Sequence, residues 1–94
     1  MDFEWDDAKA ASNFGKHGVE FDFAIRVFLD KARADLDASR ATDGETRRKA
    51  VGTVQGELST VVYTERQNLV RIISARRANV SEARIHASIR ARSE

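Results

Sequence analysis

The sequence predicts an α+β domain in which an antiparallel β-meander is accompanied by two N-terminal helices and one C-terminal helix. Residues 58–66 and 69–77 are rich in Val, Ile, Thr and Tyr, which favour a pleated, half-buried surface. Gln67 and Asn68 supply a turn between these stretches, which together predict a β-hairpin. Apolar residues at helical spacing before the hairpin and an Ala-rich segment after it predict the helices. We expect all 94 residues, 1–94, to form one domain.

The chain begins with a predicted strand and a first helix. Phe3 and Trp5 alternate with a polar residue, which predicts a short strand with both rings on its core face. Asp6 is a suitable N-cap, because its carboxylate accepts the free amide hydrogens of a helix start. We expect this helix to cover residues 7–14 and to end at Gly15, which adopts left-handed backbone angles easily.

A second helix is predicted over residues 20–29. One face is apolar at the spacing i, i+3, i+4 and i+7, and it is formed by Phe21, Ala24, Ile25 and Phe28. Between the two helices, Lys16 and His17 stand between two glycines, where we expect a short cationic loop. A Lys-His pair at this place is also typical of a helix C-terminal cap, so both interpretations remain open.

The remaining segments predict a meander with short connections. Residues 31–43 predict an edge strand, and residues 50–54 predict a strand that turns back through residues 55–57. A two-residue hairpin loop sets three cross-strand pairs: Arg66 with Leu69, Thr64 with Arg71, and Val62 with Ile73. Ser81 is a suitable N-cap for the last helix, whose thin apolar stripe predicts weak packing on the sheet or on a partner.

Charge is unevenly distributed along the chain. Residues 1–45 carry 11 acidic and 6 basic side chains, whereas residues 46–94 carry 4 acidic and 10 basic ones, so the net charge of +1 hides a basic C-terminal half. This asymmetry favours a face that binds an anion, and nucleic acid is the commonest large anion in a cell. The alternative is that folding mixes both halves into a neutral surface.

Composition limits the possible chemistry. The chain has no cysteine, which excludes disulfides and thiolate metal sites, and its two histidines lack the spacing of a metal pair on one helix. We therefore expect no metal and no cofactor. No apolar run approaches the roughly 20 residues that span a bilayer, and no leader opens the chain, so we expect a cytoplasmic protein without a membrane partner.

The arginines of the predicted hairpin are the first candidates for a binding site. A planar guanidinium matches phosphate oxygens, and a strand holds it rigidly; the alternative is that these arginines are solvated strand ends. Metal-free acid–base chemistry suffices to cleave RNA, because the ribose 2′-hydroxyl is an internal nucleophile. The candidate phosphate-binding residues are Arg47, Arg66, Arg71, Arg76 and Arg77. The candidate catalytic residues are His17, Lys16, Glu45, Tyr63, Arg66 and Arg76.

Several motifs occur in order along residues 2–82 and indicate a family. They include Phe3-Glu4-Trp5-Asp6, Lys16-His17-Gly18-Val19, Glu45-Thr46-Arg47, Tyr63-Thr64-Glu65-Arg66 and the run from Arg71 to Ala78. With these motifs in this order, the chain resembles the BrnT toxins of bacterial type II toxin–antitoxin modules. It departs from the family's usual pattern in the last helix, where Ile85 and His86 occur without a tyrosine.

The resemblance implies a small ribonuclease with the fold of RelE-like toxins, which cuts RNA and so blocks translation. It also implies a BrnA-like antitoxin with a ribbon–helix–helix part, through which the complex would contact operator DNA. The alternative function is a non-catalytic binding module that holds an acidic antitoxin-like partner or a nucleic acid on its basic sheet.

Overall fold

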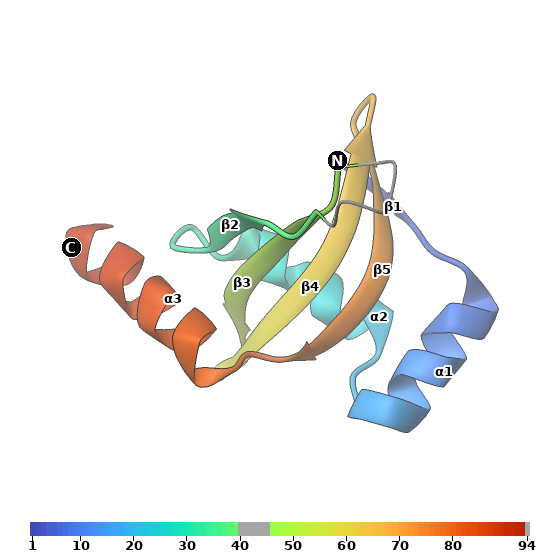
Figure 1. Cartoon of the computed structure of the whole chain (residues 1–94), viewed down its shortest axis with the longest axis horizontal. Helices are drawn as coiled ribbons and strands as arrows, with labels where there is room; N and C mark the ends of the chain where they lie inside the picture. Colours follow the sequence, from blue (N-terminus) through green and yellow to red (C-terminus); the bar gives the residue numbers. More distant parts are fainter. Residues whose placement is uncertain (40–45, 94) are drawn as a thin grey trace.

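The computed structural model of this chain describes residues 1–39 and 46–93 and confirms the α+β class. In the described ranges the strands form one five-stranded sheet in the order β1-β5-β4-β3-β2, with helices packed against it (Figure 1). None of the helices in these ranges is long and apolar enough to cross a membrane. The elements, in chain order, are β1 (Asp2–Glu4), α1 (Asp7–His17), α2 (Phe21–Ala24), the 3₁₀ helix η1 (Ile25–Leu29), β2 (Ala34–Asp37), β3 (Arg48–Val54), β4 (Glu57–Arg66), β5 (Leu69–Arg77) and α3 (Val80–Ser93).

The predicted meander is confirmed for β2 to β5, which pair antiparallel with their neighbours in the chain. The expectation of an antiparallel sheet is wrong for β1, which lies parallel to β5 at the edge of the sheet. A hairpin turn forces consecutive strands to run antiparallel. The β1 strand is separated from β5 by most of the chain, so no turn constrains its direction.

The register of the β4–β5 hairpin follows the prediction only near the turn. Arg66 pairs with Leu69 and Thr64 pairs with Arg71, as predicted. The third predicted pair is wrong, because the register shifts beyond Tyr63 and Val62 faces Ser74 instead of Ile73. Ile73 is therefore the extra residue of a β-bulge. The pairs on either side of it are Tyr63 with Ile72 and Val62 with Ser74.

Helix α1 begins as predicted but ends three residues later than expected. The side chain of Asp6 caps it by accepting the amide of Lys9 at 3.0 Å. Gly15 lies inside the helix, and Gly18, with φ of 70°, is the residue that ends it. The helix continues because buried Asn13 holds the following turn by donating its side-chain amide to the carbonyl of Val19. The predicted cationic loop is therefore the last helical turn.

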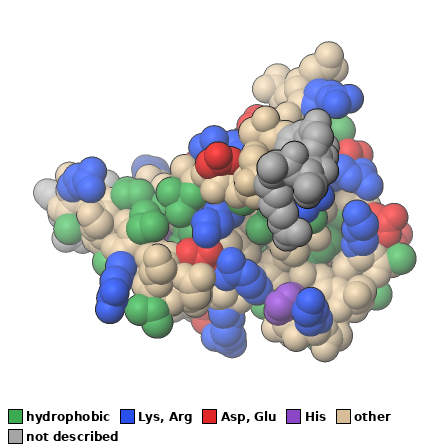
Figure 2. Space-filling view, viewed as in Figure 1, with side chains coloured by type: hydrophobic (Ala, Val, Ile, Leu, Met, Phe, Trp, Pro, Cys, Tyr) green, Lys and Arg blue, Asp and Glu red, His purple; other side chains and the backbone are tan. Residues whose placement is uncertain are grey.

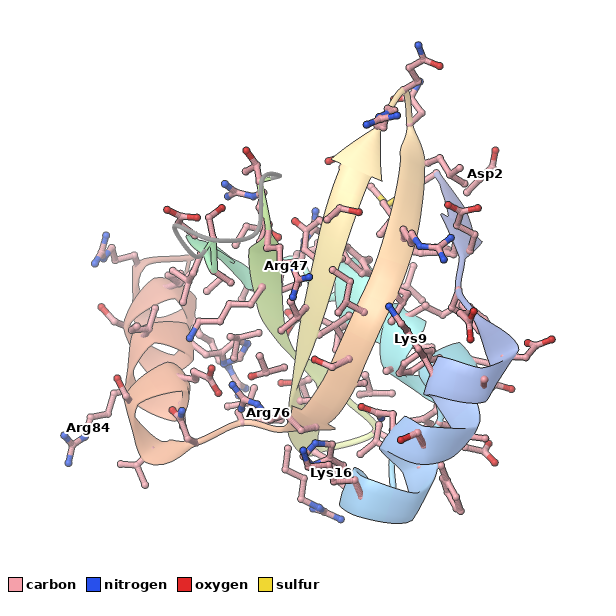
Figure 3. All side chains as sticks on the ribbon, turned by 45° about the vertical axis from the view of Figure 1, so that its right-hand side comes forward. Asp2, Lys9, Lys16, Arg47, Arg76 and Arg84 are labelled. Carbon is pink, nitrogen blue, oxygen red and sulfur yellow. The ribbon has the colours of Figure 1, made fainter. Side chains whose placement is uncertain are left out.

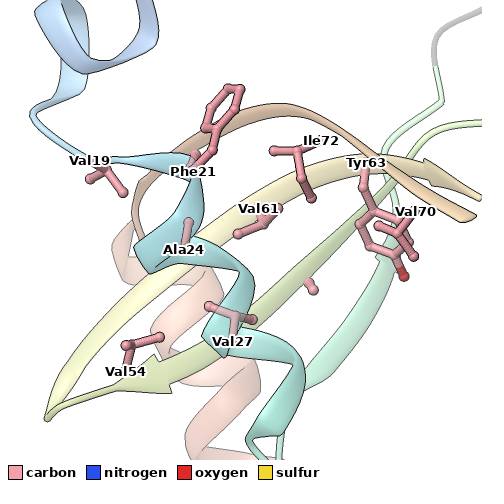
Figure 4. Packing of buried hydrophobic residues seen from close by; sticks show 11 residues of the cluster. Val19, Phe21, Ala24, Val27, Val54, Val61, Tyr63, Val70 and Ile72 are labelled. Atoms are coloured by element: carbon pink, nitrogen blue, oxygen red, sulfur yellow. The ribbon is translucent and has the colours of Figure 1, made fainter. Parts of the chain in front are cut away.

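The second predicted helix is present, but its C-terminal half is a 3₁₀ helix, which changes the buried residues. A 3₁₀ helix has about three residues per turn, so the inward positions follow a spacing of three. Phe21, Ala24 and Val27 accordingly point toward the strands (Figure 4). Phe28 is half-buried, and its ring lies edge-on against Tyr63 with centroids 5.1 Å apart. The helices α2 and η1 pack on this side of the sheet, and we call it the covered face.

Helix α3 begins two residues earlier than the predicted N-cap Ser81 would allow. Its N-cap is Asn79, whose side-chain oxygen accepts the amide of Glu82 at 2.8 Å. Further along α3, His86 is buried, and its Nε2 lies 2.8 Å from Oδ2 of Asp30. The same Asp30 oxygen accepts the backbone amide of Thr53 in β3 at 2.8 Å. Asp30 therefore links α3 to β3.

The close packing of η1 on β3 generates the first prediction. A Cβ atom at Gly52 would lie 2.9 Å from Cγ1 and 3.0 Å from the carbonyl oxygen of Val27. We expect Gly52→Ala to lower the free energy of unfolding by about 2 kcal/mol, because the backbone of η1 must move to admit the methyl group. Urea unfolding followed by circular dichroism measures this change.

Gly15→Ala is the matched control for this substitution. A Cβ atom at Gly15 meets nothing within 4 Å, and Gly15 lies inside a helix, so alanine should be neutral or stabilise by up to about 1 kcal/mol. Equal effects of the two substitutions would contradict the packing described for Gly52.

Candidate active site

The face of the sheet opposite α2 is the candidate active site, and we call it the open face. In Figure 1 α2 lies behind the sheet, so the open face of β3, β4 and β5 is turned toward the viewer. Side chains alternate along a strand, so Thr60, Val62 and Thr64 of β4 project to this face while Val61 and Tyr63 enter the core. Figure 2 shows more basic than acidic side chains on it.

The β-bulge at Ile73 places Arg71 and Arg76 on the same face. The two arginines are five residues apart, and in a regular strand such a separation directs side chains to opposite faces. In this structure Arg71 pairs with Thr64 and Arg76 pairs with Thr60, and these threonines lie four residues apart on β4. The arginines therefore share the open face.

A polar groove of about 780 Å³ lies at the hairpin end of the open face. The guanidinium of Arg71 donates to the carboxylate of Glu4 at 3.2 Å, and both side chains are about half exposed. An exposed pair of this kind contributes about 0 to 1 kcal/mol, so Arg71 can exchange Glu4 for another anion. The lining residues are Glu4, Thr46, Thr64, Glu65, Arg66, Gln67, Leu69 and Arg71.

At the opposite end of the open face, Glu82 of α3 is buried among hydrogen-bond donors and is only 1% exposed. Arg76 donates to both carboxylate oxygens, at 2.8 and 2.9 Å, in a bidentate pair. The ammonium of Lys49, the hydroxyl of Thr60 and the backbone amide of Asn79 each donate at 2.9 Å. We call these four donor residues, Lys49, Thr60, Arg76 and Asn79, the Glu82 pocket.

The donors of the Glu82 pocket control the protonation of the carboxylate. Burial raises the pKa of Glu82, but the hydrogen bonds from Arg76, Asn79, Lys49 and Thr60 oppose burial and hold this pKa well below its usual range. The hydrogen bond to Glu82 in turn raises the pKa of Arg76. One carboxylate therefore faces two cationic side chains, and the pocket with its occupant keeps a net positive charge.

Lys16 and His17 lie in the last turn of α1, where they are exposed and where a positive charge is favourable to the helix dipole. Asn13 ties this helix to β5 by hydrogen bonds to the carbonyl and amide of Ala75, at 2.8 and 3.1 Å. The end of α1 that carries Lys16 consequently lies beside the end of β5 that carries Arg76 (Figures 1 and 3). The pair is placed near the Glu82 pocket end of the sheet.

The structure does not bring Tyr63 together with the arginines of the open face. Tyr63 is 4% exposed on the covered face, and its hydroxyl donates to Oδ1 of Asp35 at 2.9 Å. Burial raises the pKa of the phenol, and the hydrogen bond to Asp35 raises it further. The sheet itself separates this hydroxyl from the open face.

The other candidates from the sequence occupy different surroundings. Arg77 is exposed and donates to Glu57 at 3.2 Å. Arg47 exchanges backbone hydrogen bonds with the side chain of Ser39, and its half-buried side chain lies over the sheet in Figure 3. Glu45 lies outside the described residues.

Sequence reasoning missed Lys49, Thr60 and Glu82 as members of the site. A usable signal was present, since Asn79 and Glu82 have the spacing of a capping box, in which each residue bonds the backbone amide of the other. Both bonds form here, at 2.8 and 2.9 Å. Recognising this box would have placed Glu82 in the first turn of α3, directly after β5.

The open face can bind a phosphodiester and stabilise negative charge. Its arginines and Lys49 supply cationic donors, and the neighbouring turn of α1 supplies an imidazole. Among the described residues, no group of three or more His, Cys, Asp or Glu side chains could hold a metal ion. The cationic side chains of the face can bind anions, and the imidazole beside it can accept and donate protons.

An α+β domain with a largely antiparallel sheet and one uncovered basic face is consistent with the RelE-like toxin fold. The family model described as "Ribonuclease toxin, BrnT, of type II toxin-antitoxin system" matches residues 5–82. The chain therefore belongs to the BrnT family and is a ribonuclease toxin of a type II toxin–antitoxin system, which confirms the resemblance drawn from its motifs. Such a toxin implies a cognate antitoxin. A search of curated proteins gives no match.

The lowered pKa of Glu82 predicts a pH-dependent contribution to stability. We expect Glu82→Gln to lower the free energy of unfolding by about 2 kcal/mol at pH 7, because the charged hydrogen bonds are lost. The loss should shrink as pH falls below about 4.5, where the unfolded chain begins to protonate this carboxyl and the wild type loses the same contribution. Urea unfolding at pH 7 and at pH 4 measures both values.

Glu57→Gln is the matched control, because it removes an exposed carboxylate from a comparable ion pair with Arg77. This control should change stability by no more than about 0.5 kcal/mol. An equal loss for Glu82→Gln at both pH values would show that the charge of Glu82 does not stabilise the fold.

Proposed function

We propose that this chain is a metal-independent endoribonuclease that binds the RNA backbone on its open face and inhibits translation by cutting RNA. The observation that carries the proposal is the common placement of Arg66, Arg71 and Arg76 on that face, with the bulge at Ile73 as its structural cause. Guanidinium groups on paired strands are held in place before substrate binds, as transition-state stabilisation requires. The expected site of action is the cytoplasm.

The proposed reaction uses the nucleophile that RNA provides. The ribose 2′-hydroxyl loses its proton and attacks the adjacent phosphorus, the bond to the 5′-oxygen breaks, and that oxygen is protonated as it leaves. Arg66 and Arg71 bind the backbone, while Arg76 and Lys16 stabilise the developing charge. His17 carries the protons, because its imidazole has one nitrogen that can accept a proton and another that can donate one.

Two further catalytic candidates are alternatives to His17 as the proton carrier. Tyr63 has its hydroxyl on the covered face and a raised pKa, which favour His17 over the phenol. Glu45, two positions before Arg47 in the sequence, remains an alternative general base. Arg47 and Arg77 are proposed as additional contacts to the RNA backbone.

The proposed partner is a BrnA-like antitoxin with a ribbon–helix–helix part. Family membership supports the existence of an antitoxin, and the basic open face supports a partner that covers it with acidic and apolar groups. In this proposal the toxin meets operator DNA only through the antitoxin.

Induced expression in a bacterium tests the proposal directly. Growth should stop, and the purified protein should cleave RNA in the presence of EDTA. Cleavage that needs an added divalent metal would overturn the mechanism. Antitoxin binding without any RNA cleavage would favour the alternative function, a non-catalytic binding module.

The proposed role of His17 predicts that its substitution affects RNA cleavage but not antitoxin binding. We expect His17→Ala to slow RNA cleavage by about a hundredfold, because a general acid–base group contributes about 10² to 10⁴ in rate. Antitoxin affinity and thermal stability should remain unchanged, because His17 is exposed at a helix end. Lys31→Ala, which also removes an exposed cation, serves as the control and should retain full activity. Wild-type cleavage rates in His17→Ala would remove His17 from the mechanism.

The role of the groove arginines predicts a change in salt dependence. Each phosphate contact on single-stranded nucleic acid contributes about 0.7 to the slope of log K against log salt concentration. We expect Arg66→Ala and Arg71→Ala each to reduce that slope by about 0.7, measured by fluorescence anisotropy with a 2′-deoxy oligonucleotide. Arg26→Ala is the control, because Arg26 is exposed on η1 and its guanidinium lies over the ring of Phe23. Unchanged slopes for both groove variants would place the RNA elsewhere.

A further inference from the structure

We infer that the Glu82 pocket is a phosphate-binding pocket of the active site and that Glu82 occupies it as an internal substitute for a phosphate of RNA. The inference rests on the proposed ribonuclease function and assigns a defined subsite to it. The subsite is closed while Glu82 occupies it, and it opens when the first turn of α3 moves away from the sheet.

The donor set of the pocket is the set that recognises phosphate. Arg76 presents two parallel N–H groups, Lys49 an ammonium, Thr60 a hydroxyl and Asn79 a backbone amide, all within 2.8 to 2.9 Å of the Glu82 oxygens. Bidentate guanidinium and ammonium groups bind phosphate as well as carboxylate, because both present closely spaced anionic oxygens. A phosphate that entered the pocket would find every donor already directed toward it.

The charge of the pocket favours a phosphoryl group over the carboxylate. Two cations, Lys49 and Arg76, face the single negative charge of Glu82. A phosphodiester also carries one negative charge, but the phosphorane formed by attack of the 2′-hydroxyl carries two. The pocket is therefore better matched to the reacting phosphate than to its present occupant, as transition-state stabilisation requires.

The pocket and its occupant belong to different parts of the fold. Lys49, Thr60 and Arg76 lie on β3, β4 and β5, which the sheet pairing holds in place. Glu82 belongs to α3, which packs beside β2 and β3 and whose His86 pairs with Asp30. Displacement of the first turn of α3 would remove Glu82 and leave three of the four donors in position.

Glu82→Ala tests the inference, with inorganic phosphate as the probe. We expect the variant to bind phosphate at least about tenfold more tightly than the wild type, measured by calorimetry at constant ionic strength with chloride as the reference anion. A 2′-deoxy oligonucleotide, which cannot be cleaved, should show a gain in the same direction. Adding Arg76→Gln to Glu82→Ala should abolish both gains, because the bidentate donor is lost.

Glu57→Ala is the matched control, because it frees Arg77 from an exposed ion pair without opening a buried pocket. This control should gain far less phosphate affinity than Glu82→Ala, because a single exposed guanidinium lacks the other donors of the Glu82 pocket. If Glu82→Ala does not fold, Glu82→Gln replaces it, because the amide keeps the volume of the side chain and weakens its hold on Arg76.

A folded Glu82 variant that binds phosphate no better than the wild type would overturn the inference and make Glu82 a permanent structural contact. This outcome differs from failure of the proposed function. In that case the variant would gain phosphate affinity while the wild type cleaved no RNA under any condition.

Discussion

One extra residue in β5 determines which side chains of this strand enter the core and which face solvent on the open side. Without the bulge at Ile73, the strand would keep strict alternation, and the inward positions could not include both Ile72 and Ala75. The same shift moves Arg76 onto the face that carries Arg71. Core packing and the basic surface therefore depend on a single irregularity, and removing it would reverse one half of the strand.

The Glu82 pocket shows why α3 stays on the sheet although its apolar surface is thin. Val80 is 68% exposed and Ile85 is 36% exposed, so burial of apolar side chains holds this helix only weakly. Removing a carboxylate from water is costly, but the hydrogen bonds from the charged partners of Glu82 outweigh that cost, as its lowered pKa shows, and they specify one position for the helix. Polar contacts to Glu82 therefore fix the position of the helix. In our inference a phosphate can take the place of Glu82 in these contacts, whereas it could not take the place of a buried apolar side chain.

Features determined by neighbouring residues could be predicted from the sequence, and features determined by distant ones could not. The hairpin turn at Gln67 and Asn68 and the cap at Asp6 depend on nearby side chains, and both are present. The bulge depends on how β5 meets the core, and the end of α1 depends on Asn13 contacting Ala75 in β5. Among the site residues, the arginines were predictable from strand chemistry, whereas Glu82 required the contacts between α3 and three strands.

The two ends of the open face are too far apart to bind the same phosphate. Arg71 and Arg76 oppose threonines four residues apart on β4, a separation of about 14 Å at about 3.4 Å per residue. A phosphate held by the groove of Arg66 and Arg71 must therefore be distinct from one held by Arg76 in the Glu82 pocket. Lys16 lies at the Arg76 end of β5, so the proposed chemistry belongs at that end. The groove would then bind the flanking backbone, and its arginines would act on RNA affinity more than on the rate of bond cleavage.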